Sequence, residues 1–399
     1  MNLRTLDNIE FDNKRVLLRV DLNVPLVNGH VIDNTRVKRI KPTVDELIAR
    51  GAAVILLSHL GRPQGKPDSK LSLRPLVDVL KEELPGRRIT FVDDVVGDRA
   101  KSAVDSLDAG DVLLLENLRF DPREESNDVS FAKRLASFGD VYIDDAFSCA
   151  HRAHASIDAL AKLLPSAAGR EMAHELDVLE GALKDPDRPL AAIIGGAKVS
   201  TKLSVLESLA ARVDTLIIGG GMANTFLKAR GVEIGNSLCE HTYLETARQV
   251  EKSLTYHGGT IVLPHDVVTA AALELDIASQ TVPANRVPSD AMILDIGPET
   301  IARIGECLSS CRTLVWNGPL GTFEVPPFDA GTIGVGRAVA KQTTEGRLRS
   351  IAGGGETLAA INKAGVAEDF TYLSAAGGAF LEWLEGRELP GVAVLCSPE

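Results

Sequence analysis

Two lysines follow a glycine pair near the middle of the chain. Residues 195–202 have the sequence GGAKVSTK, directly after the apolar segment PLAAII. A strand that ends in glycines and leads into a helix often binds phosphate, because glycine lets backbone N–H groups approach an anion. The segment does not match the P-loop pattern GxxxxGK[ST]. Lys198 and Lys202 are four residues apart, so they would lie close to one face of a helix that begins near Val199. We interpret them as charges for a nucleotide's phosphates; the alternative is a solvated surface pair.

Two further glycine clusters follow apolar segments in the second half of the chain, at residues 219–221 and 353–355. Ligands of parallel sheets bind beyond the carboxyl ends of strands, so three such clusters favour a phosphate site over packing alone. The dinucleotide pattern GxGxxG does not fit the cluster at 219–221, because Asn224 stands where the third glycine would be.

Basic side chains follow the strands expected in the first half. Arginine is the preferred residue for bidentate recognition of carboxylate and phosphate, although a single arginine is more often part of a surface ion pair. Asp21 and Asn23 in the same region can orient an arginine or accept a hydrogen bond from a substrate hydroxyl. The first half therefore looks suited to a small polyanion. The basic residues are Arg19, Arg36, His59, Arg62, Arg119, His151 and Arg152.

Metal-binding alternatives are weak in this sequence. His151 and His154 lie close together in DAFSCAHRAH, but no matching carboxylate or thiolate pair accompanies them. Cys307 and Cys311 are spaced four apart on an expected helix and lack further ligands in the same way. We expect buried thiols at these two positions.

The elements that position these residues alternate almost from end to end. Apolar, β-branched segments are separated by amphipathic ones, such as the helix expected over residues 35–50. This pattern predicts parallel sheets covered by helices on both faces. Ten or more strands exceed one comfortable sheet, so we expect an α/β protein with two doubly wound, Rossmann-like domains. A break near residues 163–170 and a linking helix over 171–185 would join them.

Composition limits the possible partners. The 399 residues carry a net charge of −12 and are 45% hydrophobic, which favours neither nucleic acid nor an anionic membrane as a partner. No apolar segment approaches the ~20 residues of a membrane span, and the N-terminus lacks an apolar signal core. Five scattered cysteines suggest no disulfide framework. We expect a cytoplasmic protein.

Seven motifs, taken together and in order, resemble the phosphoglycerate kinase family over essentially the whole chain. They are RVDLNVP (19–25), SHLGRP (58–63), DAFSCAHRAHAS (145–156), GGAKVSTK (195–202), WNGPLGTFE (316–324), GGGET (353–357) and LEWLEGRELPGVAV (381–394).

The resemblance implies reversible phosphoryl transfer between 1,3-bisphosphoglycerate with ADP and 3-phosphoglycerate with ATP, the substrate-level phosphorylation step of glycolysis. It also implies Mg²⁺ carried with the nucleotide, a monomer, and domains that close about a hinge helix. Residues 1–167 would bind phosphoglycerate and residues 168–376 the nucleotide. Residues 377–399 would pack back on the N-terminal domain.

The resemblance also assigns the site residues, with Arg36 and Lys198 at the transferring phosphoryl group. The phosphoglycerate side would comprise Arg19, Asp21, Leu22, Asn23, Arg36, His59, Leu60, Gly61, Arg62, Arg119, His151 and Arg152. The nucleotide side would comprise Gly195, Lys198, Lys202, Gly219, Asn317, Glu324, Gly354, Gly355, Glu356 and Thr357, with Glu356 at the metal.

Several positions depart from the common family pattern. Glu356 replaces the usual aspartate, and Ala375 and Ala376 replace a threonine and a glycine near the expected transfer site. Ser148–Cys149 and His265 also differ, and the sequence offers no physical account of them. Two alternatives stay open at this point: a different carboxylate kinase, and a protein that binds both ligands without catalysis.

Overall fold

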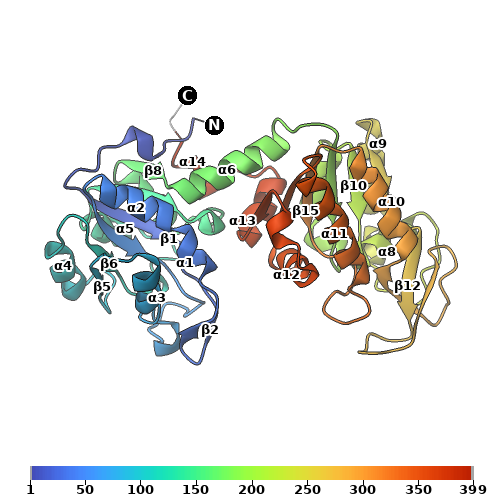
Figure 1. Ribbon diagram of the computed structural model, residues 1–399, viewed down its shortest axis with the longest axis horizontal. Coiled ribbons are helices and arrows are strands. Elements are labelled where there is room, and N and C mark those ends of the chain that lie inside the picture. The colour runs from blue at the N-terminus through green and yellow to red at the C-terminus, as the bar shows by residue number, and fades with distance from the viewer. Residues whose placement is uncertain (1, 397–399) are drawn as a thin grey trace. The chain divides into compact units, whose positions relative to one another are not determined.

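The alternating apolar segments form two parallel sheets, one in each of two units (Figure 1). The computed structural model describes residues 2–396. Unit 1 comprises the residues up to 177 together with those from 388 on, and unit 2 comprises residues 178–387. Helix α6 (Arg170–Leu183) begins in unit 1 and ends in unit 2. The two-sheet α/β fold expected from the sequence is confirmed.

The sheet of unit 1 has six parallel strands in the order β5-β6-β4-β1-β7-β8. The chain runs outward from β1 through β4 and then returns to β7 on the other side of β1. This reversal of direction creates the crevice in which ligands of wound sheets bind. The strands are β1 (Arg15–Val20), β4 (Ala53–Leu57), β5 (Ile89–Phe91), β6 (Val112–Leu114), β7 (Val141–Asp145) and β8 (Ser166–Ala168).

The helix expected over residues 35–50 is broken in two. Helix α1 (Thr35–Arg39) ends at Ile40, and α2 (Lys41–Ala49) begins at the next residue. Pro42 explains the break, because it lacks an N–H and its ring clashes with the carbonyl four residues earlier. Unit 1 also contains β2 (Leu26–Val27), β3 (His30–Val31), α3 (Leu76–Glu83), α4 (Asp98–Asp105), α5 (Val129–Ala136) and α14 (Pro390–Ala393).

The main sheet of unit 2 also has six parallel strands, in the order β11-β10-β9-β15-β16-β17. The direction reverses between β9 and β15, and Ile194 at the end of β9 is paired with Asn317 at the end of β15. The strands are β9 (Leu190–Ile194), β10 (Thr215–Ile218), β11 (Thr260–Val262), β15 (Thr313–Asn317), β16 (Arg349–Gly353) and β17 (Tyr372–Ser374).

One apolar segment expected in a parallel sheet lies elsewhere. The segment AMILDIG forms β14 (Met292–Ile296), which pairs antiparallel with β12 (Asp266–Ala270), as does β13 (Ser279–Pro283). No helix separates these three strands, so the chain lacks the crossover that parallel pairing requires. The helices of unit 2 are α7 (Leu203–Ala210), α8 (Gly220–Ala229), α9 (Leu244–Tyr256), α10 (Pro298–Ser309), α11 (Ala330–Thr344), α12 (Gly355–Ala364) and α13 (Gly377–Leu384).

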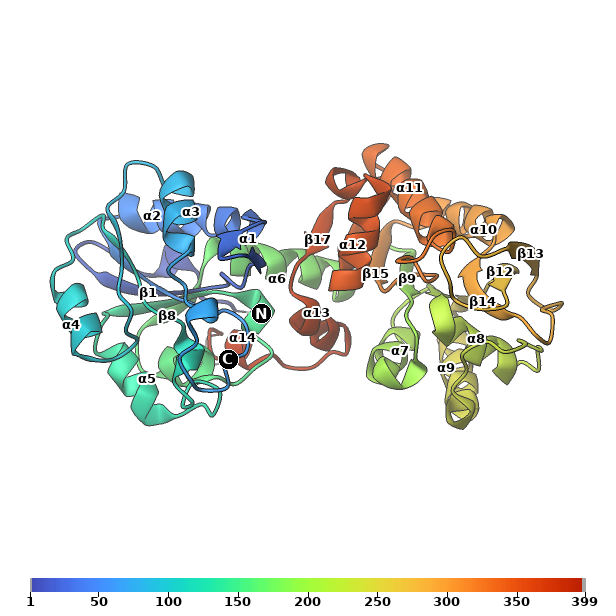
Figure 2. The ribbon, with the colours of Figure 1, turned by 90° about the horizontal axis from the view of Figure 1, so that it is seen from below.

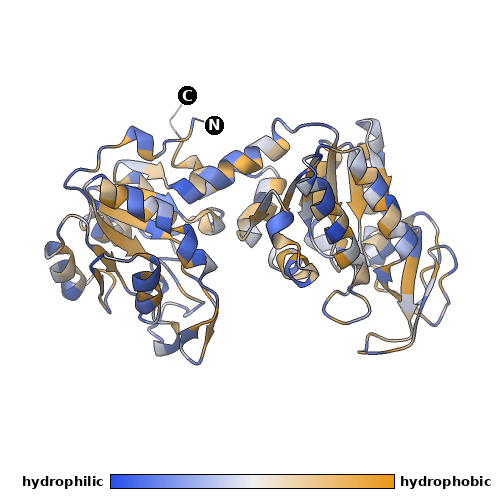
Figure 3. Cartoon of the chain, in the orientation of Figure 1, coloured by the Kyte–Doolittle hydropathy of each residue, from blue (hydrophilic) through white to orange (hydrophobic). Residues whose placement is uncertain are grey.

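Helices cover both faces of each main sheet (Figure 2). The strands are apolar and the helices carry polar residues on their outer sides (Figure 3), as expected for strands that are buried on both faces. Within residues 2–396, no helix is both long and apolar enough to cross a bilayer. Three short 3₁₀ helices bear on the sites described below: η3 (Leu118–Phe120), η4 (Phe147–Cys149) and η7 (Val199–Thr201).

Candidate active site

Asp21 organises the charged groups that follow β1 in unit 1. Its Oδ2 accepts hydrogen bonds from Arg36 Nη1 and from the hydroxyl of Ser148, and its Oδ1 accepts one from the backbone N–H of Asn23 at 2.9 Å. Burial alone would raise the pKa of Asp21, but the charge of Arg36 and the other donors lower it overall. Asp21 is therefore a carboxylate that holds Arg36 in place.

The loop after β4 is tied to the same region. Gly61 donates its N–H to Asn23 Oδ1 at 2.9 Å, and its carbonyl accepts from Arg119 Nη1 at 2.8 Å. The positive φ of Gly61 favours glycine at this turn. Leu60 is buried and holds the loop through its carbonyl, which accepts from Asn117. Arg62 is exposed, and among the described residues it has no hydrogen-bond or ion-pair partner.

The segment after β7 adds a histidine and an arginine. Arg152 Nε donates to His151 Nε2 at 3.0 Å, and burial together with Arg152 lowers the pKa of His151. Burial and the surrounding arginines lower the pKa of His154 to about 3. Although its Nδ1 lies 4.0 Å from Glu124, this neutral ring forms no ion pair at neutral pH. The described residues contain no group of three or more metal-ligating side chains.

These residues form what we call the basic half-site of unit 1. It comprises Asp21, Asn23, Arg36, His59, Gly61, Arg62, Arg119, His151 and Arg152. Arg36 pairs with Asp21, and Arg119 Nε lies 3.3 Å from Glu125 Oε1. Arg62 and Arg152 have no carboxylate partner among the described residues. Leu22 contributes only buried packing beside it. Arg19 belongs to the same region but is only 1% exposed, so its side chain lies beneath the half-site rather than on its surface.

Glycines at the strand ends of unit 2 allow close backbone approach. A Cβ added at Gly195 would lie 1.9 Å from the carbonyl oxygen of Pro319, and one at Gly219 would lie 2.2 Å from Leu320 Cδ2. Both contacts are far below the distance that real Cβ atoms tolerate. The strand ends of β9 and β10 therefore require glycine.

The two lysines of GGAKVSTK do not share a helix face, contrary to expectation. Lys198 has an extended backbone and precedes η7, whereas Lys202 lies between η7 and α7. The side chain of Lys198 is exposed and has no partner within residues 2–396. Lys202 Nζ donates to the carbonyls of Gly195 at 2.7 Å and Asn317 at 3.3 Å. Burial lowers the pKa of Lys202 to about 8, while the charge of Glu356 opposes that shift.

The glycine cluster after β16 opens helix α12. Gly354 has a φ of +97° and precedes the first helical residue, Gly355. The side chain of Asn317 bridges to it by donating to the carbonyl of Gly353 at 2.8 Å, and Thr357 Oγ1 accepts from the N–H of Gly318 at 2.7 Å. Glu356 is exposed in the first turn of the helix. The arrangement presents a helix N-terminus and a carboxylate at one strand end.

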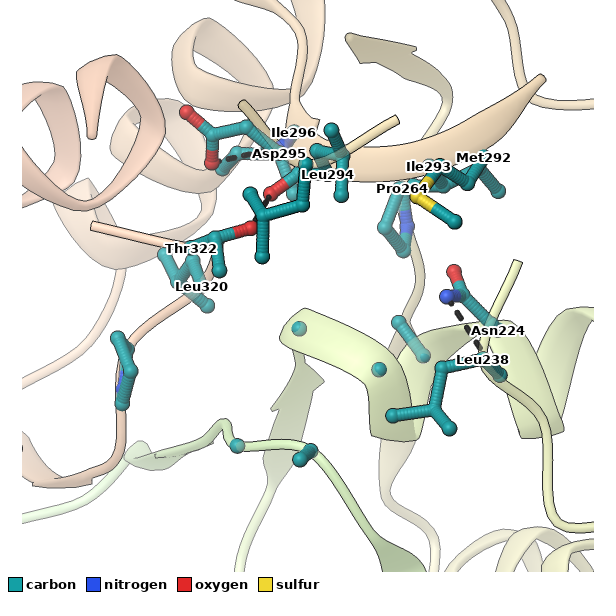
Figure 4. A pocket seen from close by; sticks show the side chains of 18 of the residues that line it. Asn224, Leu238, Pro264, Met292, Ile293, Leu294, Asp295, Ile296, Leu320 and Thr322 are labelled. Atoms are coloured by element: carbon teal, nitrogen blue, oxygen red, sulfur yellow. Dashed lines mark hydrogen bonds between the residues drawn. The ribbon is translucent and has the colours of Figure 1, made fainter. Parts of the chain in front are cut away.

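A cavity of about 380 Å³ lies beside these strand ends and glycines (Figure 4). Its walls are largely apolar, with Leu238, Pro264, Met292 and Leu320 among them, and Glu324 and Glu356 also line it. Asn224 donates from its Nδ2 to the carbonyl of Leu238 at 3.2 Å, but its buried Oδ1 has no partner among the described residues. A cavity of this size with a few polar groups is typical of a small-molecule site. We call this the glycine-lined cavity.

Comparison with known proteins decides the family. A family model described as phosphoglycerate kinase matches residues 6–387. The chain is 55% identical to a phosphoglycerate kinase of Methylorubrum extorquens over 395 residues, covering 99% of this chain and 98% of that protein. It is 53% identical to one of Ruegeria sp., covering 99% and 100%. The chain belongs to the phosphoglycerate kinase family.

Solved structures of the family agree with this fold. The phosphoglycerate kinase of Coxiella burnetii matches with a TM-score of 0.90 at 40% identity, and that of Pyrococcus horikoshii with 0.83 at 31% identity. Each match covers 98% of both chains. The resemblance noted in the sequence is confirmed, and the structural matches extend over both units.

Sequence reasoning missed several polar residues that support these sites. Ser148 was noted only as a departure from the family pattern, yet it donates to Asp21. Glu124 and Ser156 were not singled out, yet both are buried beneath the basic half-site and bonded to each other. Long-range contacts of this kind leave no spacing pattern, because the partners are more than 30 residues apart.

Proposed function

We propose that the basic half-site binds 3-phosphoglycerate or 1,3-bisphosphoglycerate and that the glycine-lined cavity binds ATP or ADP. The family reaction joins these substrates. The main support is that different residue types gather at the places in the two main sheets where the strand order reverses. Arginines and histidines gather where β1 meets β7 in unit 1, while glycines, lysines and a helix N-terminus gather where β9 meets β15 in unit 2. The former suits a small phosphate- and carboxylate-bearing substrate, and the latter a nucleotide.

The reaction needs little proton chemistry. A carboxylate oxygen of 3-phosphoglycerate attacks the γ-phosphorus of ATP, so a carbon–oxygen–phosphorus link forms and the bond to the bridging oxygen of ADP breaks. The carboxylate is already ionised at neutral pH, so no general base is required. The principal barrier is the approach of two polyanions, which cations lower by neutralising charge.

Arg36 and Lys198 are the proposed cations at the transferring phosphoryl group. Each can be released to a ligand at modest cost: Arg36 leaves Asp21 bonded to Ser148, and Lys198 is exposed without a partner in the described chain. Because one belongs to each unit, we expect transfer to require domain closure. Lys202 would hold the nucleotide phosphates, and Glu324 the ribose.

The residues at α12 fit a magnesium ion that arrives with the nucleotide. Mg²⁺ in kinases is commonly held by one or two carboxylates together with substrate phosphates and water. Glu356 is an exposed carboxylate at the N-terminus of α12, beside the glycine-lined cavity. When bound, the ion would neutralise charge on the nucleotide phosphates. Glu356 is the residue that would hold it.

The test is a steady-state assay with 3-phosphoglycerate and MgATP, in which a coupled NADH-consuming dehydrogenase removes the acyl phosphate. We expect turnover, and we expect Lys198→Ala to lower it at least tenfold, or ~1.4 kcal/mol of transition-state stabilisation. Lys252→Ala, at an exposed lysine of α9, is the matched control. A smaller loss in Lys198→Ala would remove Lys198 from the transfer step. Absence of turnover despite binding of both substrates would instead implicate Ala375, Ala376 and Glu356.

The same membership supports finer assignments that we also propose: a monomer in a reducing cytoplasm, with no nucleic acid or membrane partner. All five cysteines are free thiols, which accords with a reducing compartment.

A further inference from the structure

Arg19 at the end of β1 is held on almost every side by protein atoms. Its Nε donates to Ser156 Oγ at 3.0 Å, and its Nη1 donates to the carbonyl of Val20 at 2.5 Å. Its Nη2 lies 3.1 Å from His59 Nδ1 and 3.7 Å from Cys149 Sγ. With these partners and only 1% of its surface exposed, Arg19 is poorly placed to contact a substrate directly.

The contact with His59 fixes the state of that ring. A guanidinium has five N–H donors and no acceptor, so the Nδ1 that faces it must be the accepting, unprotonated nitrogen. The proton of a neutral imidazole then resides on Nε2. Within the described chain Nε2 has no hydrogen-bond partner, and it is not among the buried unpartnered atoms. It is therefore the polar atom that His59 offers to the basic half-site.

A buried carboxylate holds Arg19 in this position. The hydroxyl of Ser156 accepts from Arg19 and donates to Glu124 Oε1 at 2.6 Å, while the backbone N–H of Ser156 donates to Glu124 Oε2 at 2.9 Å. Glu124 is fully buried, and the nearby charge of Arg19 opposes the rise in its pKa that burial causes. The hydroxyl of Ser156 therefore lies between the guanidinium of Arg19 and the carboxylate of Glu124.

The groups around His59 come from several elements. Arg19 lies on β1, Asp21 follows β1, Arg119 lies in η3, and Arg152 follows η4. Burial and the charge of Arg19 lower the pKa of His59 well below its usual range, Asp21 acts in the opposite direction, and Arg119 and Arg152 lower it further. A ring that is 5% exposed among three arginines stays neutral through the physiological pH range.

We propose that Arg19 is a positioning residue, which holds His59 as a neutral ring whose Nε2–H donates to a phosphate or carboxylate oxygen of the substrate. The substrate part of this proposal rests on the function proposed above. The sequence led us to expect Arg19 at the substrate, whereas we now propose that it supports a residue that contacts the substrate. Neutral His59 adds a directed hydrogen bond without adding charge, so it helps to fix the orientation of the substrate beside the forked N–H donors of the arginines.

The first test is independent of activity. In the full-length protein without substrate, ¹⁵N NMR of the histidine side chains, assigned with His59→Gln, should show His59 protonated at Nε2 and unchanged between pH 5 and 8. Protonation at Nδ1, or titration near the ordinary pKa of about 6.5, would overturn the proposal. A protein that passes this test but has no kinase activity would contradict the proposed function and leave the role of Arg19 standing.

Substitution of Arg19 provides the second test. Arg19→Met should remove the hydrogen bond to Nδ1, so that neither ring nitrogen of His59 is bonded and the pKa of the ring moves toward the ordinary value of about 6.5. The KM for 3-phosphoglycerate should then rise several-fold from pH 6 to pH 8, relative to the native protein, as the ring loses its charge. Arg50→Met, at a partly buried arginine that donates to the carbonyls of Leu6 and Ile9, should change neither the spectrum nor this ratio.

Removing Arg19 alone leaves Glu124 as an uncompensated buried charge and risks unfolding the protein. The double variant Arg19→Met/Glu124→Gln removes both charges and should give the same His59 spectrum as a folded Arg19→Met. If either folded variant lost phosphoglycerate affinity at every pH while His59 kept its Nε2 proton, Arg19 would be a direct substrate contact. The proposal would then be wrong.

Discussion

The two candidate half-sites present different kinds of group to the proposed ligands. Unit 1 presents long charged side chains, and protein groups hold two of them in place: Asp21 holds Arg36, and the carbonyl of Gly61 holds Arg119. Unit 2 uses backbone at strand ends, where Gly195 and Gly219 leave room that no other residue would. The half-site of unit 1 therefore depends on charged side chains and their contacts. The half-site of unit 2 depends on glycines, where a side chain would clash with the neighbouring strand end.

The comparison predicts different sensitivities. A side-chain site should lose function when one charged group is removed, with the fold intact. A site built from backbone should lose function and stability together when a strand-end glycine is replaced by a residue with a Cβ atom. The four predictions below begin with the largest expected effect.

Arg36→Ala should lower kcat by about 100-fold or more, as expected when one group that stabilises transition-state charge is removed. Stability should fall only modestly, because Asp21 loses the charge that offsets its burial but keeps its bonds from Ser148 and Asn23. Arg39→Ala is a closely matched control on the same helix, since the side chains of Arg36 and Arg39 are 30% and 29% exposed. Steady-state kinetics and thermal unfolding give both quantities. Equal activity in the two variants would end the proposed role of Arg36.

Gly195→Ala should break the backbone half-site. The new methyl group would meet the carbonyl of Pro319, so the strand end must shift, at a cost of about 1–3 kcal/mol in the free energy of unfolding. We expect kcat/KM for MgATP to fall at least tenfold, measured beside denaturant unfolding. Gly305→Ala on α10 is the control, because a Cβ there would meet only Ala338 Cβ at 3.6 Å, an ordinary van der Waals distance. If Gly195→Ala behaved like the control, close backbone approach would not be needed at this strand end.

Lys202 provides a pH-dependent test of unit 2. Because its pKa is about 8, the side chain is charged below that pH and loses its charge above it. The kcat/KM for MgATP should therefore fall several-fold as pH rises through 8. Lys202→Arg should flatten the profile, because arginine remains protonated. A persistent fall in Lys202→Arg would assign the titration to another group.

Glu356→Asp should have the smallest effect. The longer carboxylate of the native protein can still reach a metal, but the geometry that Mg²⁺ requires is strict and that of Mn²⁺ less so. Restoring aspartate should raise the ratio of Mg²⁺- to Mn²⁺-supported activity a few-fold, below about 1 kcal/mol. An unchanged ratio would mean that the length of this side chain is unimportant.

The sequence was most informative where one local rule acts alone. Apolar segments ending in glycine gave the strand ends of β9, β10 and β16, because burial on both faces and close backbone approach each restrict the residue types allowed. The break at Ile40 could also have been predicted, since Pro42 excludes a continuous helix. The antiparallel position of β14 was missed because its apolar pattern fits a buried strand of either direction.

Burial of the charged residues was beyond the sequence. Arg19 in β1 and Arg36 in α1 were both expected to contact substrate, yet one is buried and the other is partly exposed. The difference arises from Ser156 and Glu124, which only the folded sheet brings to Arg19. The separation of Lys198 from Lys202 by η7 has a similar origin, because the first turn after a strand depends on the tertiary contacts of the strand end.

Residues 3–4 and residues 391–396 lie together in unit 1. Leu3 forms a β-bridge with Cys396, Arg4 donates to the carbonyls of Val394 and Leu395, and Gly391 donates its N–H to the carbonyl of Ala150 at 2.9 Å. During synthesis, unit 2 is therefore complete in sequence before unit 1 receives its last piece. Unit 2 can therefore fold first, because unit 1 lacks part of its packing until the segment that follows residue 387 has been synthesised.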